Sequence, residues 1–190
     1  MRTRYLYGLA LAAVLTAAAG EVAAADLSYN HLGLGVGNIE LDDSDADGTG
    51  FSVDGSFAIH PNAYLIGRYA NWDLDGPDRE DFRVGGGLHT PLQSNVDLIG
   101  ELFYENRDYD INGRGDDDND GLGLRGGVRA KAAPRLELDG GAVYYALDED
   151  DAAGVWGEAW YDVTQPIQAG LQAELTDEES IISLGGRYRF

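Results

Sequence analysis

Apolar and polar residues alternate along most of this chain, and the last ten residues show the pattern most clearly. The even-numbered positions of this segment are Ile182, Leu184, Gly186, Tyr188 and Phe190. The odd-numbered positions from 183 onward are Ser183, Gly185, Arg187 and Arg189. A β-strand sends successive side chains to opposite faces. The alternation therefore predicts a strand over 181–190 with one apolar and one cationic face.

The same alternation predicts ten strands. Their expected ranges are 27–40, 48–60, 63–73, 81–90, 95–107, 120–131, 136–147, 154–163, 167–176 and 181–190. In the regular strands the apolar set contains no charged residue, whereas the opposite set carries Arg, Asp, Glu and Gln side chains. A charge that faces lipid at mid-bilayer costs roughly 2–4 kcal/mol, so a lipid-facing surface accounts for this exclusion.

The composition of the two faces favours a closed barrel over the alternative of a soluble sandwich. The apolar face is rich in Gly and Ala, which would interlock poorly as a core but are harmless against lipid. Small residues on the polar face relieve crowding inside a narrow closed sheet. These residues are Gly85, Gly87, Gly123, Gly127, Gly141 and Gly170. We expect an all-β fold, a transmembrane antiparallel up-and-down β-barrel of about ten strands, or eight if two edge segments pair poorly.

Three segments alternate less regularly. In the first, the apolar phase changes between Tyr29 and Leu32, which predicts a β-bulge. In 63–73 we expect Leu65, Gly67 and Tyr69 outside and Arg68 inside. In 154–163 we expect Val155, Ala159, Tyr161 and Val163 outside and Trp156, Glu158, Trp160 and Asp162 inside.

The beginning of the chain has the pattern of a secretory signal. Arg2 and Arg4 precede an uncharged run over 5–19, and Ala23 and Ala25 form a small-x-small cleavage site. This run is too short for a membrane-spanning helix. We therefore expect 1–25 to be a cleaved signal peptide and 26–190 to be the barrel domain. The chain has no Cys, so an exported protein of this kind depends on its core or on a bilayer for stability.

The connections between the expected strands are of two kinds. Short ones contain proline: 60–62, 90–95, 132–135 and 164–166. The others are rich in Asp and Glu: 41–47, 73–81, 108–120, 148–153 and 177–180. Short turns on one side and longer loops on the other are typical of outer-membrane barrels. We expect the proline turns in the periplasm and the acidic loops outside the cell.

The formal net charge of −21 also limits the partners of this protein. Acidic external loops argue against binding to nucleic acid or other polyanions. Instead we expect outer-membrane lipid as the surroundings, the barrel-assembly machinery as a partner during insertion, and a monomer.

Several motifs resemble those of small outer-membrane barrels of Gram-negative bacteria, and the terminal Phe190 resembles the end of their closing strand. More narrowly, the chain is similar to the diffusible-signal-factor-regulated outer-membrane barrel family. The residues that carry this similarity are Leu27-Ser28-Tyr29-Asn30, Ala58-Ile59-His60-Pro61-Asn62, Asn95-Val96-Asp97-Leu98, Gly126-Gly127-Val128-Arg129-Ala130 and Gly186-Arg187-Tyr188-Arg189-Phe190. The resemblance implies a location in the cell outer membrane and carries over no catalytic motif.

Two acidic segments are candidate calcium sites. Asp43, Asp45 and Asp47 precede Gly48, and Asp116, Asp118 and Asp120 precede Gly121. Alternate carboxylates followed by a turning glycine can wrap oxygen ligands around Ca²⁺. However, no flanking helices are expected, and Asp54 stands where an EF-hand would place Glu. A weak Ca²⁺ site is thus one interpretation, and a solvated acidic surface is the other. We expect no further cofactor.

Charged residues are also expected inside the barrel. The expected inward cations are Arg68, Arg83, Arg125, Arg129 and Arg187. The expected inward carboxylates are Asp54, Glu101, Glu105, Glu137, Asp139, Glu158 and Glu174. Charges removed from water need partners, so a salt-bridge network filling the lumen is one interpretation. A narrow, porin-like passive channel is the alternative.

We do not expect an enzyme. An outer-membrane hydrolase would need a His beside a nucleophile or an Asp pair on the outer face. His31, His60 and His89 lie instead early in the first strand or at proline turns. The sequence favours a role in envelope structure or surface interaction.

Overall fold

The computed structural model describes residues 27–41, 47–74, 78–110, 116–148 and 151–190. The strands in these ranges are β1 (His31–Leu41), β2 (Asp47–His60), β3 (Ala63–Leu74), β4 (Asp78–Gln93), β5 (Val96–Asp110), β6 (Asp116–Ala133), β7 (Leu136–Leu147), β8 (Asp151–Asp162), β9 (Ile167–Thr176) and β10 (Glu179–Arg189). Across the described part of the chain, no helix is long and apolar enough to pass through a membrane.

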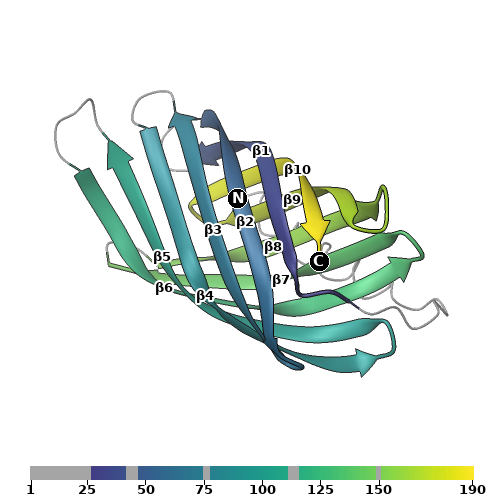
Figure 1. The fold of residues 1–190 in the computed structure, drawn as a ribbon. Coiled ribbons are helices and arrows are strands. Elements are labelled where there is room, and N and C mark those ends of the chain that lie inside the picture. The colour runs from purple at the N-terminus through teal and green to yellow at the C-terminus, as the bar shows by residue number, and fades with distance from the viewer. Residues whose placement is uncertain (1–26, 42–46, 75–77, 111–115, 149–150) are drawn as a thin grey trace.

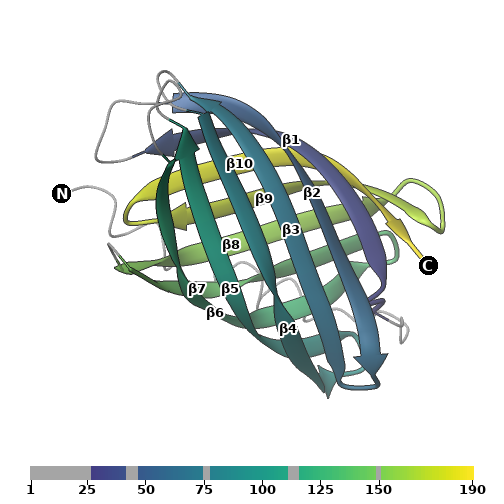
Figure 2. The same cartoon turned by 60° about the vertical axis from the view of Figure 1, so that its left-hand side comes forward.

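All ten strands form one closed antiparallel barrel (Figure 1). Each strand pairs with its neighbours in sequence, and β1 pairs with β10 to close the ring, as Figure 2 shows. The prediction of an up-and-down barrel of about ten strands is confirmed, and the alternative of eight strands is wrong. Closure leaves no strand edge unpaired, which is the condition for a sheet to span a membrane.

The two ends of the barrel differ, and we name them by their residues. At the turn end, short turns at Pro61–Asn62, Ser94–Asn95, Pro134–Arg135 and 163–166 join the strands. At the acidic end lie the strand termini Leu41, Asp47, Leu74, Asp78, Asp110, Asp116, Leu147, Asp151, Thr176 and Glu179.

The outer face of the wall is apolar. Among its exposed side chains are Leu34, Val36, Leu65, Leu88, Leu102, Leu124, Leu171 and Leu184. Leu88 and Leu184 are 67% and 62% exposed, which fits an outer face that contacts lipid. The expected orientations in β3 and β8 are confirmed, since Leu65 and Tyr161 are exposed whereas Trp156 and Trp160 are buried.

The expected bulge between Tyr29 and Leu32 is wrong. β1 pairs in unbroken register with both β10 and β2 from His31 onward. The apolar phase changes because Tyr29, just before β1, is buried inside the barrel together with Tyr64. Register shifts occur instead beside the turns, at Ala58/His60, Pro91/Gln93 and Lys131/Ala133.

Strands β3 to β6 extend further toward the acidic end than the sequence predicted. Most of 73–81 and several residues of 108–120 belong to strands rather than connections. The extension of β4 has a physical reason, because the strand period places Arg79 inside the barrel, where it pairs with Asp81 and Glu179. The intervening acidic residues, such as Glu80, point outward.

Glycines of the inner face make room for large side chains. A Cβ at Gly123 would collide with the ring of Phe103, and one at Gly170 with the ring of Trp160. On the outer face, by contrast, Gly100 has nothing within 4 Å of such a Cβ. The prediction that small inward residues relieve crowding is therefore confirmed.

Candidate functional site

The lumen is the candidate functional site because its charged side chains interact across the barrel. We describe three layers of contacts from the acidic end to the turn end. Each layer joins strands that are not neighbours in the sheet, and the first two layers join strands on opposite sides of the ring.

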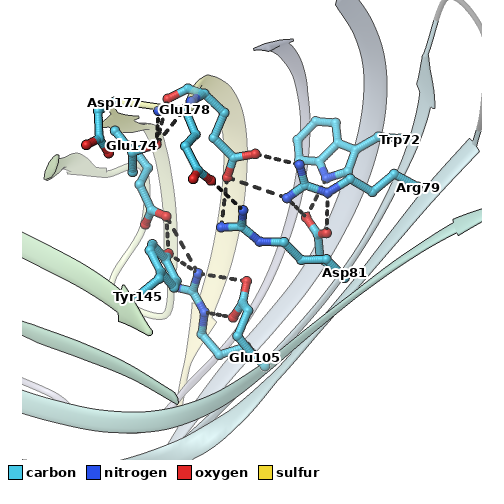
Figure 3. A network of polar contacts seen from close by, with 12 residues as sticks. Trp72, Arg79, Asp81, Glu105, Tyr145, Glu174, Asp177 and Glu178 are labelled. Carbon is cyan, nitrogen blue, oxygen red and sulfur yellow. Dashed lines mark hydrogen bonds and ion pairs between the residues drawn. The ribbon is translucent and has the colours of Figure 1, made fainter. Parts of the chain in front are cut away.

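The first layer, which we call the acidic-end plug, consists of Arg79, Asp81, Arg107 and Glu179 (Figure 3). Arg79 Nε donates to Asp81 Oδ1 over 2.6 Å, and Arg79 Nη1 donates to Glu179 Oε2 over 2.5 Å. Arg107 Nη2 lies 3.1 Å from Glu179 Oε1. Since β5 and β10 lie on opposite sides of the ring, the Arg107–Glu179 pair spans the lumen.

Apolar side chains surround the acidic-end plug. The buried cluster consists of Ile39, Ala70, Trp72, Leu74 and Ile181, with Leu41 and Tyr109 packed against it. Trp72 Nε1 donates a hydrogen bond of 2.9 Å to Asp81 Oδ2, which fixes the carboxylate facing Arg79. This cluster keeps water away from the ion pairs and so strengthens them.

The second layer, the central brace, is built around Arg83 and Glu174 (Figure 3). Arg83 Nε donates to Glu105 Oε2 over 2.6 Å, and its Nη2 lies 3.6 Å from Glu174 Oε1 on the opposite side of the ring. Glu174 also accepts hydrogen bonds from Arg125 and from the hydroxyl of Tyr145. The Arg83 guanidinium lies over the ring of Phe103 at 4.4 Å.

The third layer, the turn-side brace, centres on Glu137, which is fully buried. Arg129 Nη2 lies 2.5 Å from Glu137 Oε1, and Arg187 donates to the same oxygen. Arg187 Nε also donates to Gln168 Oε1 over 2.5 Å, and its guanidinium lies 4.4 Å from the ring centroid of Trp160. One carboxylate therefore holds two arginines, and Trp160 covers one of them.

Tyr29 lies inside the barrel near the turn end. Its hydroxyl donates to Asp97 Oδ2 over 2.8 Å, and its ring stacks on His89 at 3.9 Å between centroids. Tyr64 lies 4.7 Å away, and the Arg129 guanidinium covers the ring at 4.7 Å. Because Tyr29 precedes β1, it is held by these side chains rather than by the sheet.

A cavity of about 110 Å³ lies between the central brace and Tyr29. Its charged lining consists of Arg68, Arg83, Arg125, Arg129, Arg187, Asp54, Glu101, Asp139, Glu158 and Glu174, with His31 beside them. Five arginines thus face five carboxylates, and the fixed charges balance. A second cavity, next to the acidic-end plug, measures only about 10 Å³.

The expected salt-bridge network is present, and the structure adds members that the sequence did not indicate. All five inward arginines expected from the sequence line the larger cavity. The sequence did not indicate the acidic-end plug because Arg79, Asp81 and Glu179 lie in 73–81 and 177–180, the segments expected to be connections. The signal was available, since Arg79, Asp81 and Arg83 are alternate residues and continue one strand face.

The residues of the calcium hypothesis lie in different places. Asp43 and Asp45 fall outside the described residues, and Asp47 is the first residue of β2. Asp116, Asp118 and Asp120 belong to β6, where they pair in register with Asp110, Asp108 and Asn106. They therefore lie on extended strand rather than in the expected loop. Within the described ranges, no three His, Asp or Glu side chains form a group suited to a metal ion.

The histidines His31 and His89 lie against aspartates within the wall. His31 Nε2 is 3.4 Å from Asp54 Oδ2, and His89 Nδ1 is 3.0 Å from Asp97 Oδ2. His60 ends β2 at the turn end and accepts a hydrogen bond from the Asn62 amide.

The comparisons with known proteins found solved structures with a similar fold but no matching protein family. No family model and no curated protein matches the chain. Among solved structures, it is similar to the NanC porin, with 8% identity over 84% of this chain and all of that one and a TM-score of 0.47. It is also similar to the KdgM porin, with 6% identity over 84% and 99% of the two chains and a TM-score of 0.46. A third is Ail of Yersinia pestis, with 16% identity over 85% and 99% of the two chains and a TM-score of 0.42.

The structure of the chain itself indicates that the protein spans a membrane. A closed barrel with an even number of antiparallel strands, an apolar outer face and a polar interior is the form of bacterial outer-membrane proteins. The protein is a β-barrel of the Gram-negative outer membrane.

Proposed function

We propose that this protein is a barrel with a closed lumen that serves envelope structure or surface interaction through its acidic end. The observation that carries the proposal is the pair of salt bridges that span the lumen, Arg107–Glu179 at 3.1 Å and Arg83–Glu174 at 3.6 Å. They lie at two successive levels, so a solute entering from the acidic end meets both.

Opening these levels would be costly. Glu179 is 2% exposed and contacts both Arg79 and Arg107, so its displacement would leave two arginines without this carboxylate. Removing one partner of a buried ion pair costs roughly 3–5 kcal/mol. An open state of the acidic-end plug would therefore be rarely populated.

The outer face at the acidic end supports a surface role. Carboxylates replace apolar residues there, and Asp73, Asp78, Glu80 and Asp118 are exposed. They follow the apolar part of each strand, so they would lie at or beyond the lipid headgroups. The proposal includes periplasmic turns, an external acidic end, a cleaved signal peptide over 1–25, and a monomer that contacts lipid and, during insertion, the assembly machinery. It also includes membership of the diffusible-signal-factor-regulated family.

Conductance tests the closed lumen. The refolded protein, inserted into a planar bilayer at neutral pH, should show no stable current steps. A variant that removes both levels and the turn-end aromatic residue, Tyr29→Ala/Arg83→Ala/Arg107→Ala/Glu174→Ala/Glu179→Ala, should conduct. Well-defined current steps from the wild-type protein would contradict the closed lumen. They would support the second candidate function, a narrow passive channel, which the cavity of about 110 Å³ favours.

Thiol labelling of intact cells tests the orientation. Because the chain has no Cys, single cysteines report without background. Asp45→Cys, Asp118→Cys and Asp150→Cys should react with an impermeant thiol reagent, whereas Asn62→Cys and Pro134→Cys should not. The reverse pattern would show that the acidic end faces the periplasm.

A further inference from the structure

The central cavity is lined by hydrogen-bond donors and acceptors that have no partner among the described residues, and the salt bridges that span the lumen do not use these atoms. With a volume of about 110 Å³, it has room for several water-sized groups. Five arginines and five carboxylates line it, so its fixed charge is balanced. A lone anion or cation entering this space would lose its hydration and gain no net attraction. A neutral solute that carries both charges can place each of them beside a lining charge of opposite sign.

Two buried donors lie on one part of the wall. Trp156 is 7% exposed, and its Nε1 has no hydrogen-bond acceptor among the described residues. Arg125 Nε is likewise unpartnered within the described chain, although Arg125 donates to Glu174 through Nη2. The Arg125 guanidinium lies 4.6 Å from the Trp156 ring centroid, so the two donor groups are close together. A carboxylate in the cavity could accept from both.

Two carboxylates lie beside these donors, two strand positions nearer the turn end. Asp139 on β7 pairs in register with Glu158 on β8, so two like charges lie on adjacent strands inside the lumen. Asp139 is 5% exposed, its Oδ1 has no hydrogen-bond donor in the described ranges, and Arg129 Nε is 3.6 Å away. An ammonium group would supply donors and reduce the repulsion between the two carboxylates.

The spacing of the two groups defines the size of the solute. Trp156 and Glu158 are two positions apart on the inner face of β8, and two strand residues span roughly 7 Å. We propose that the cavity is a binding site for a small zwitterion, a molecule with one carboxylate and one ammonium group a few bonds apart. Its carboxylate accepts from Trp156 and Arg125, and its ammonium group donates to Asp139 and Glu158.

The test uses the full barrel refolded in detergent micelles, where both ends are accessible. Glycine, β-alanine and 4-aminobutyrate are titrated calorimetrically, and acetate and methylammonium chloride serve as the two halves of the ligand. We expect saturable one-to-one binding of at least one zwitterion, and a rise in unfolding temperature with its concentration. Acetate and methylammonium at the same concentration should give neither.

Variants assign the binding to this cavity. Trp156→Phe removes the donor and keeps an aromatic ring beside Arg125, and Asp139→Asn removes one negative charge. Each should weaken binding of the zwitterion by about tenfold, the effect of losing one hydrogen bond to a charged group. The matched controls Tyr161→Phe and Asp73→Asn lie on the outer face and should bind like wild type.

Heat-modifiable migration on gels verifies that each variant is folded before titration. The proposal is overturned if no zwitterion gives saturable heat, because the cavity would then hold only water. It is also overturned if acetate or methylammonium binds equally well, or if folded Trp156→Phe and Asp139→Asn both bind like wild type. A conducting wild-type barrel would contradict the closed lumen and leave this binding result unchanged.

Discussion

The two ends of the lumen are filled by side chains of different kinds. At the acidic end, Arg79, Asp81, Arg107 and Glu179 project from strands of the sheet and pair across the barrel. At the turn end, the residue inside the lumen is Tyr29, which precedes β1; its side chain makes one hydrogen bond and packs against neighbouring rings. The contacts at the acidic end are ionic and join paired strands, whereas those at the turn end are mainly aromatic and involve a segment outside the sheet.

This difference indicates where the barrel can open. Moving Arg107 or Glu179 requires separation of buried charges or distortion of the wall, since both side chains belong to paired strands. Moving Tyr29 requires rearrangement of the short segment 27–30, whose contacts include hydrogen bonds from Ser56 Oγ to the Tyr29 carbonyl and from the Ala58 amide to Asn30 Oδ1. Access to the central cavity should therefore be easier from the turn end.

The largest expected effect is at the acidic end. Glu179→Gln keeps the shape of the side chain but removes the charge that Arg79 and Arg107 share, so the free energy of unfolding should fall by about 3–5 kcal/mol. Urea unfolding of the barrel refolded in lipid vesicles measures this change. Glu80→Gln, an exposed outward residue of β4, is the control and should unfold like wild type. Equal free energies of unfolding for the two variants would mean that the ion pairs of the acidic-end plug do not stabilise the barrel.

The second prediction concerns Tyr29. In a Ser183→Cys background, the thiol faces the cavity and is 2% exposed as serine, so it should react slowly with a charged thiol reagent. Adding Tyr29→Ala should raise the labelling rate at least tenfold, because the ring that covers the turn end is removed. Tyr29→Phe keeps the stacking on His89 and should label almost as slowly as the parent. If Arg107→Ala accelerates labelling more than Tyr29→Ala does, the acidic end is the easier route.

The third prediction compares the two faces of the wall between these ends. Gly123→Ala places a methyl group against the ring of Phe103, and overpacking of this kind costs about 1–3 kcal/mol. Gly100→Ala on the outer face meets nothing within 4 Å and should not destabilise the barrel. Urea unfolding of both variants distinguishes the faces. A Gly100→Ala variant as unstable as Gly123→Ala would contradict the assignment of inner and outer glycines.

The smallest expected effect concerns calcium at the acidic end. If the Asp-rich segments bind Ca²⁺, the affinity should be weak, roughly 10⁻⁴–10⁻³ M. Calorimetric titration of wild type, Asp45→Asn and Asp118→Asn measures it, with NaCl at equal ionic strength as the control. A loss of heat in the variants would support binding. Heat that both substitutions leave unchanged, or that NaCl reproduces, would mean a diffuse acidic surface without a site.

The local pattern of the sequence was sufficient for the wall of the barrel. Alternation is a property of neighbouring residues, so the ten strands, the outward Leu65 and Tyr161 and the inward Trp156 and Trp160 could be predicted. The absence of charge from the apolar set also indicated the lipid face, because a bilayer penalises such charges strongly. The inward small residues followed from the same period, since a narrow closed sheet must leave room for its large side chains.

Tertiary structure decided how the lumen is filled. Arg79 and Glu179 are 100 residues apart in the sequence, and only closure of the ring brings them together. From the sequence alone, the charged residues of 73–81 indicated a solvated loop. In the barrel, most of them belong to β3 and β4, and Arg79 points inward to pair with Glu179. Tyr29 was misinterpreted for a related reason, because an aromatic residue out of phase with the following strand predicted a bulge. Its position depends on Tyr64, His89 and Asp97 from distant strands, and no local pattern encodes contacts that exist only after the sheet has closed.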